Sequence, residues 1–332
     1  MIKKLVRFFC VSLVIITCVG CGEDMTVFER KPFFSISVEG HGAAYAVLMN
    51  GLTVYRSIDR EIQVSTKIHV NHLIVSGDNE IKILVYRDED TGTMPEGAKV
   101  AVNLMLRDFD DKDSKAVFGL GFENGHYYSS REPGNYSTVN FDKSDDGKLI
   151  VKELDVKEDD VWKKIEFASV NAEFNTSLPR WAFENGDDLP VYTSLGRDGF
   201  NQERDRLMPL YEEIQAKISA QDWGWIKDKF AERNREYDLA LYRAPGETEK
   251  LLIKSFKNVS NPDVATPLSL KKSDGSGKYW GAMDVTMRES KFMRMTSRSK
   301  GAMLFYNFKD GSGSEYFDVV FRRQGDQWII TR

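Results

Sequence analysis

The apolar positions along the chain follow two different periods, and the change falls near residue 200. Before it, short alternating or β-branched runs are separated by turns rich in glycine, asparagine and aspartate. Several short strands at this spacing are typical of an all-β sandwich. The predicted strands cover residues 33–38, 45–49, 81–86, 99–106, 148–154 and 165–174.

From Asp205 onward the apolar residues recur every three to four positions, which predicts amphipathic helices. We place Pro209 in the first turn of the first helix, where proline is tolerated. Asp222 can cap the second helix, which should end before Pro245-Gly246. The three apolar stripes are Leu207, Leu210, Tyr211, Ile214 and Ile218, then Ile226, Phe230, Tyr237 and Leu241, then Leu251, Leu252, Phe256 and Val259.

After Pro262 the strand pattern returns, over residues 279–285, 302–308, 315–323 and 327–331. Helices followed by antiparallel strands predict an α+β arrangement in which the helices cover one face of the sheet. Because a chain of this length exceeds what one core usually serves, we predict two domains. A β-sandwich would occupy residues 33–200 and an α+β domain residues 201–332.

The first residues carry a pattern of their own. Lys3, Lys4 and Arg7 form a basic start, and the fifteen residues from Phe8 to Gly22 contain no charge. A membrane-spanning helix needs about twenty apolar residues, so this run predicts a cleavable signal peptide over residues 1–20. An uncleaved anchor or ordinary secretory cleavage are the alternatives.

The end of the apolar run, Cys18-Val19-Gly20-Cys21, resembles the lipobox of bacterial lipoproteins, although that family usually has leucine where Cys18 stands. The resemblance implies that Cys21 is acylated and becomes the first residue of the mature chain, with residues 21–32 as a lipidated linker. Gly22 is not the aspartate that retains such proteins in the inner membrane. The resemblance therefore implies an outer-membrane anchor and a body that faces the periplasm.

Cysteine usage and charge exclude several kinds of chemistry. All three cysteines lie at positions 10, 18 and 21, so the processed chain has no disulfide, cysteine nucleophile or cysteine metal site. Residues 1–20 contain three basic and no acidic residues, so processing changes the net charge from −5 to −8. An acidic body argues against nucleic acid as a partner, and the acyl chains would supply the attachment to the membrane.

Two short motifs resemble known folds. The turn Asn50-Gly51 and the segment Leu73–Ile83, with Gly77 and Asn79, resemble elements of galactose-binding-like jelly rolls. The ending Val319–Ile330, with Gly325-Asp326 and Trp328, resembles the closing hairpin of nuclear-transport-factor-2-like domains. The first resemblance implies a sandwich, in a family in which many members bind no sugar. The second implies a cone of sheet and helices, either open to a ligand or filled with side chains.

Residues suited to catalysis are few. The four histidines, at 41, 69, 72 and 126, are scattered, and His69 and His72 would point to opposite faces of a strand. No phosphate-binding loop, nucleophile elbow or zinc-protease motif is present. We therefore expect a binding protein without a cofactor. Hydrolysis, if present, would have to rest on paired carboxylates.

One segment matches a calcium loop in spacing. Asp142, Ser144, Asp146 and Glu153 stand at positions 1, 3, 5 and 12 of an EF-hand loop, with Gly147 at position 6. Ile150 replaces a polar ligand, and the flanking residues have strand character. We therefore favour a β-hairpin that turns at Ser144–Gly147, without a metal.

Two other groups of residues have simple interpretations. The acidic cluster Asp108, Asp110, Asp111 and Asp113 lacks a glycine and a closing glutamate, so it reads as a solvated loop. Trp223 and Trp225 lie on different sides of the second helix, and one of them could contact a sugar or a partner. Core or interdomain packing is the interpretation we favour.

The sequence thus predicts an anchored, periplasm-facing lipoprotein that binds another protein of the cell envelope. An immunity protein that neutralises a toxin is one form of such a binder. Carbohydrate binding through the sandwich and a carboxylate-dependent hydrolase are the alternatives. An exposed patch of aromatic and acidic residues would favour sugar, and a buried carboxylate pair in an open cone would favour an enzyme.

Overall fold

The computed structural model describes residues 31–57, 59–87, 93, 96–110, 112–131, 139–140, 149–158, 161–174, 176, 178–189, 192–271, 282–285, 293–296 and 302–332. Cys21, the signal peptide and nearly all of the predicted linker lie outside these residues, and so do Asp142, Ser144 and Asp146. Within them the chain is mostly antiparallel sheet with three helices, so the prediction of a sheet-rich protein is confirmed.

Two large antiparallel sheets form the N-terminal half, residues 31–189. The first has the strand order β4 (Val64–His69), β1 (Pro32–His41), β6 (Lys99–Asp108), β7 (Lys115–Glu123) and β8 (His126–Arg131). The second has the order β10 (Leu149–Glu158), β11 (Val161–Phe174), β5 (Gly77–Tyr86), β2 (Tyr45–Met49) and β3 (Leu52–Ser57), and β9 (Val139–Asn140) pairs with β11.

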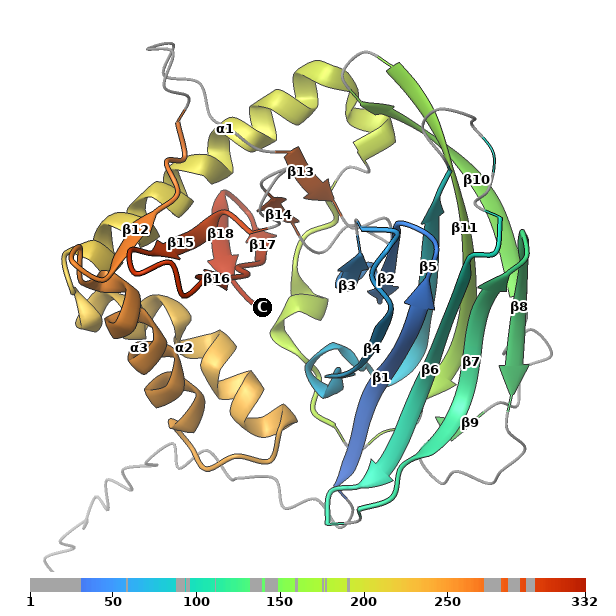
Figure 1. Ribbon diagram of the computed structural model, residues 1–332. Helices are drawn as coiled ribbons and strands as arrows, with labels where there is room; N and C mark the ends of the chain where they lie inside the picture. Colours follow the sequence, from blue (N-terminus) through green and yellow to red (C-terminus); the bar gives the residue numbers. More distant parts are fainter. Residues whose placement is uncertain are drawn as a thin grey trace, which may run out of the picture.

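The two sheets share one cluster of buried apolar side chains. Ile36 of β1 and Phe122 of β7 belong to it from the first sheet, and Val47 of β2 and Ile83 of β5 from the second. Side chains on a strand alternate between its faces, so each sheet turns one face toward this cluster. The sheets accordingly pack face to face in Figure 1.

Hydrogen bonds join the Asn50-Gly51 turn to the Leu73–Ile83 segment at the edge of this core. Asn50 and Gly51 both have positive φ, of 51° and 81°, which the tight turn between β2 and β3 requires. The side chain of Asn50 donates to Oδ1 of Asn79 (2.8 Å), and both residues are buried. Asn79 in turn donates to the carbonyls of Val75 and Gly77, each at 2.8 Å. The two parts of the motif therefore meet in space and hold two turns together.

The helices are α1 (Tyr192–Ser219), α2 (Trp223–Ala240) and α3 (Glu247–Ser260). Asp222 caps α2 as predicted, because its carboxylate accepts from the backbone N–H of Trp225 (3.2 Å). The placement of Pro209 in a first turn is wrong, because α1 begins seventeen residues earlier. Proline lacks the N–H that would bond the carbonyl of Asp205, but both residues are exposed, so water can reach that carbonyl.

Two smaller antiparallel sheets follow the helices. One contains β12 (Ala265–Pro267), β15 (Leu304–Phe308) and β16 (Ser314–Phe317). The other contains β13 (Ala282–Val285), β14 (Met293–Thr296), β17 (Phe321–Gln324) and β18 (Gln327–Ile330). The single strand predicted over 315–323 is wrong, since β16 and β17 belong to different sheets. The predicted closing hairpin is formed by β17 and β18, with Gly325 at a φ of 59° in its turn.

A second apolar cluster lies between these sheets and the helices. Tyr211 of α1 contacts Phe321 of β17, and Phe256 of α3 contacts Phe317 of β16, both in edge-to-face geometry. Ile226 and Phe230 of α2 are buried in the same cluster. The helices thus cover the strands in the way that the α+β pattern predicts, although a division into two domains is not established by these contacts.

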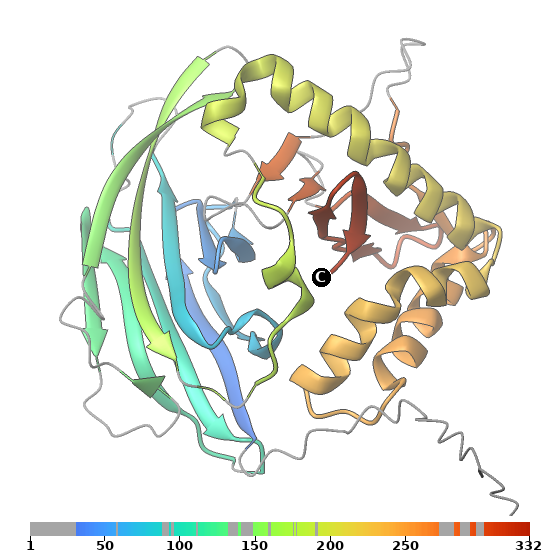
Figure 2. The same ribbon diagram turned by 180° about the vertical axis from the view of Figure 1, so that it is seen from behind.

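The two halves touch directly. The side chain of Asn71 donates to the carbonyls of Pro32 (2.9 Å) and Ala240 (2.8 Å), and the Tyr242 hydroxyl also donates to Pro32. The C terminus lies between the halves in both views (Figures 1 and 2). The predicted domain boundary at residue 200 falls inside α1. Among the described residues, no helix has both the length and the apolar character needed to cross a bilayer.

Candidate functional site

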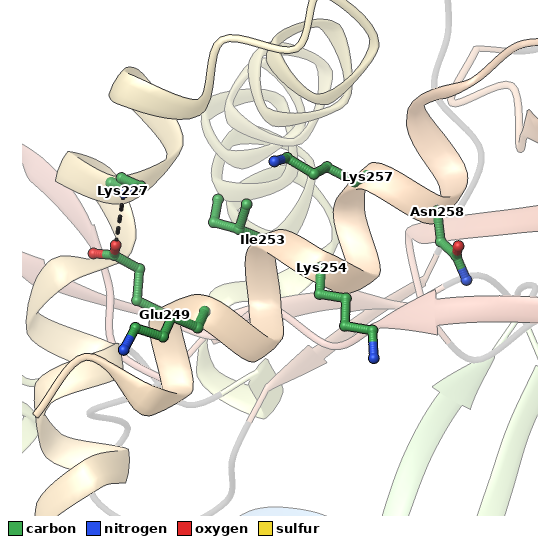
Figure 3. Close-up of a pocket in the computed structure, with 7 residues that line it drawn as sticks. Lys227, Glu249, Ile253, Lys254, Lys257 and Asn258 are labelled. Carbon is green, nitrogen blue, oxygen red and sulfur yellow. Dashed lines mark ion pairs between the residues drawn. The ribbon is translucent and has the colours of Figure 1, made fainter. Parts of the chain in front are cut away.

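A groove of about 510 Å³ lies on the surface formed by α2 and α3. Most of its lining comes from α3, and α2 contributes one lysine. Figure 3 shows Lys227 of α2 reaching toward Glu249 of α3. The lining residues are Lys227, Glu249, Lys250, Ile253, Lys254, Lys257 and Asn258.

Helical spacing explains why these residues meet. Residues four apart lie above one another on a helix. Glu249, Ile253 and Lys257 therefore form one row, and Lys250, Lys254 and Asn258 form the next. Ile253, Phe256 and Val259 of α3 are buried in the core, whereas the polar and charged residues of the two rows lie at or near the surface. We refer to the site defined by the seven lining residues as the lysine groove.

The charges in the lysine groove are partly paired. The Lys227 ammonium lies 3.0 Å from the Glu249 carboxylate, and this ion pair joins α2 to α3 (Figure 3). The Lys257 ammonium lies 5.9 Å from the ring of Trp223, within the range of a cation–π contact. Four lysines against one glutamate make the groove positive, whereas the whole chain carries a net charge of −5.

The chemistry available in the lysine groove is binding of anionic groups. A lysine ammonium is a compact point charge with three donors, suited to carboxylate or phosphate. The seven lining residues include no histidine, cysteine or pair of carboxylates, so they contain no nucleophile assisted by a base.

The tryptophans behave as the packing interpretation predicts. Trp223 and Trp225 are both partly buried and pack against the C-terminal apolar cluster. Trp225 also lies 5.7 Å from the ammonium groups of Lys217 and Lys229.

A second polar site lies at the junction of the two halves. The guanidinium of Arg332 pairs with Glu236, and both side chains are almost wholly buried, at 1% and 5% exposure. Glu236 also accepts from the backbone N–H of Ala182 (2.6 Å). The Arg332 guanidinium covers the ring of Phe183 at 4.6 Å. Because the pair is buried and contacts residues of both halves, it holds the halves together.

The predicted histidines do not form a site. His69 ends β4 and contacts Phe33, with ring centroids 4.7 Å apart. The placement of His72 on the same strand is wrong, because it lies in a short 3₁₀ turn (Asn71–Leu73) and stacks on Tyr237 at 4.4 Å. His41 and His126 are exposed elsewhere. Within the described part of the chain, no three metal-ligating side chains converge.

The calcium-loop residues are only partly described. Glu153 lies in β10, opposite Glu166 of β11, and Asn140 of β9 lies opposite Glu173 of the same strand. Seven residues of β11 separate these two positions, which is about 23 Å at 3.3 Å per residue. Both segments run along the same edge of β11.

This register argues against Glu153 as a calcium ligand. Asp142 follows Asn140 by two residues, a reach of about 7 Å, which leaves most of the 23 Å unbridged. We therefore predict that calorimetric titration of the purified chain with calcium shows no micromolar binding. Micromolar binding that disappears in Glu153→Gln would contradict the strand interpretation.

The acidic cluster agrees with a solvated loop. Asp108 ends β6, and Asp110 and Asp113 are exposed beside it, whereas Asp111 lies outside the described residues. No sequence motif marks the lysine groove. Lys250, Lys254 and Lys257 could have indicated the groove from the sequence, because they lie on the polar face of a predicted amphipathic helix.

No family model, curated protein or solved structure matches this chain. The assignment of a function therefore depends on the chain's own residues and geometry.

Proposed function

We propose that this protein is a lipid-anchored lipoprotein of the bacterial envelope that binds another protein through the lysine groove. The observation that carries the binding part of the proposal is a positive groove on a net negative chain. A charged surface of sign opposite to its surroundings steers and orients a partner of complementary charge.

The anchoring part of the proposal rests on the resemblance of Cys18–Cys21 to a lipobox. The first described strand begins at Pro32, eleven residues after Cys21. An extended linker of that length spans at most about 40 Å, so an acylated Cys21 would keep the folded body close to the membrane surface. An outer-membrane location facing the periplasm belongs to the same proposal.

We also propose that the body consists of a β-sandwich followed by an α+β domain. The two apolar clusters support this division, because one gathers mainly residues before 190 and the other gathers residues from Leu189 onward. The resemblance of the closing hairpin to nuclear-transport-factor-2-like domains gives a candidate fold for the second domain. Its described interior is occupied by large side chains, including Tyr211, Phe230 and Phe256.

Site-specific photo-crosslinking in intact cells tests the proposal. A photoreactive residue in place of Leu251, which is 46% exposed beside Lys250, should capture a partner protein. The same residue in place of Ile62, 55% exposed on the N-terminal half, is the matched control and should not. Lys250→Glu/Lys254→Glu in the chain that carries the crosslinker should abolish capture, because it replaces two of the four positive charges of the lysine groove with negative ones.

Metabolic labelling with a palmitate analogue tests the anchor in the same cells. Cys21→Ala should remove the label completely and leave the signal peptide uncleaved by the lipoprotein peptidase. Cys18→Ala is the control, since it lies within the segment to be removed and should keep the label. A label that persists in Cys21→Ala would rule out acylation at this cysteine.

A further inference from the structure

The geometry points to an acidic, extended peptide segment of the partner as the ligand of the lysine groove, with Glu249 as a built-in competitor for it. This inference rests on the proposed function and specifies what the groove recognises. Its first support is that the groove already holds the interaction it would make, a lysine bound to a carboxylate at 3.0 Å.

The spacing of the cations fits a peptide. Lys250 and Lys254 are four residues apart on α3, which separates them by about 6 Å along the helix axis. Alternate side chains of an extended chain are about 6.6 Å apart and point to the same face. Carboxylates at every second residue can therefore meet these two lysines in turn. Lys257, about 4.5 Å further along the axis at the end of the other row, supplies a third cation.

The composition of the groove favours carboxylates on a peptide over phosphate. Phosphate sites usually draw on arginine forks or on the N–H groups of a helix N-terminus. The lining contains no arginine, because its side-chain donors are four lysines and Asn258. Glu249, in the first turn of α3, places a negative charge there that disfavours phosphate. Leu251, which is next to Lys250 on α3 and 46% exposed, adds apolar surface that a peptide can cover and an inorganic anion cannot.

Glu249 limits the affinity of such a ligand. Its carboxylate occupies Lys227, and its negative charge repels an incoming carboxylate. Both side chains of this pair are exposed to solvent, at 49% and 32%, so the pair is weak and can be displaced. A partner carboxylate would replace Glu249 as the partner of Lys227. Because Glu249 must be released to water first, the groove binds an acidic ligand less tightly than it would without Glu249.

Titration of the full-length chain, in neutral detergent, with a fluorescent peptide of alternating glutamate and serine tests the inference. We expect saturable binding to the unmodified chain. The affinity should be at least about tenfold weaker in Lys254→Glu/Lys257→Glu and about threefold tighter in Glu249→Gln, changes of the size that exposed ion pairs produce. Lys112→Glu/Lys115→Glu, with the same change of net charge on the N-terminal half, and Glu213→Gln on α1 are the controls and should leave affinity unchanged. A peptide with glutamine in place of glutamate should not bind.

Two results would overturn the inference. One is equal weakening by the control pair Lys112→Glu/Lys115→Glu, which would mean that the peptide responds only to total charge. The other is lysine-groove-dependent binding to vesicles of anionic lipid with no binding of the peptide. If the peptide fails while the Leu251 crosslink succeeds in cells, the acidic ligand is wrong and the proposed function stands. If the peptide binds and the crosslink fails, the proposed function is wrong.

Discussion

Replacing Glu236 with alanine should destabilise the folded chain by about 3–5 kcal/mol, because it leaves the buried Arg332 guanidinium without its counter-charge. The two side chains are 1% and 5% exposed, so water cannot take the place of the lost carboxylate. The substitution also removes the acceptor for the Ala182 N–H (2.6 Å). Urea unfolding of the full chain, followed by tryptophan fluorescence, measures the change in the free energy of unfolding.

Matched variants separate burial from the mere loss of an ion pair. Lys99 and Glu123 are paired at 3.2 Å with both side chains nearly half exposed, so Glu123→Ala should change the free energy of unfolding by less than about 1 kcal/mol. The double variant Glu236→Leu/Arg332→Met should recover most of the lost stability, because a well-packed apolar pair needs no counter-charge. Equal destabilisation by Glu236→Ala and Glu123→Ala would show that the junction is open to water.

Local signals of this sequence predicted individual elements well. Tyr45–Met49 is a strand at the predicted bounds because its run of five apolar residues ends at the Asn50-Gly51 turn. Asp222 caps α2, and the sequence shows it because a short acidic side chain stands directly before a segment whose apolar residues have helical spacing. These signals depend on neighbours in sequence, so one sequence is enough to detect them.

Features that depend on distant neighbours were missed or wrong. The first turns of α1 include Gly196 and Gly199, which lower helix propensity by about 1 kcal/mol each relative to alanine and conceal the start of the helix. The break between β16 and β17 lies in a run that reads as one strand, and only the sheet pairing divides it. His72 looks like part of a strand in sequence, and its stacking on Tyr237 of α2 is a tertiary contact.

The candidate sites show the same limit. The lysine groove needs Lys227 of α2 beside Glu249 of α3, two residues that are 22 positions apart in the chain. The junction needs Arg332 beside Glu236 of α2, two residues that are 96 positions apart in the chain. Neither spacing is a motif, because the loops and helices between the residues set the distance. The predicted lipobox is the opposite case, since adjacent residues carry all of the pattern.

His72 should make the folded chain sensitive to acid. It stacks on Tyr237, its Nδ1 is closed off from solvent without a hydrogen-bond partner, and the positive groups nearest to it are Arg332, Arg233 and His69. Glu236 lies nearby on α2 but is paired with Arg332. Burial, and then the charges of Arg332 and Arg233, hold the pKa of His72 well below 6.5.

The sign of the effect follows from which state binds the proton. Below pH 6.5 the unfolded chain protonates His72 and the folded chain does not, so the stability present above pH 6.5 is lost as the pH falls toward the folded pKa. The slope reaches about 1.4 kcal/mol per pH unit.

Urea unfolding at pH 7.5, 6 and 5 should show this loss, and His72→Gln should remove most of it. Burial also lowers the pKa of His69, so the loss of stability that remains in His72→Gln has the same direction. An unchanged slope in His72→Gln would show that another group carries the acid sensitivity.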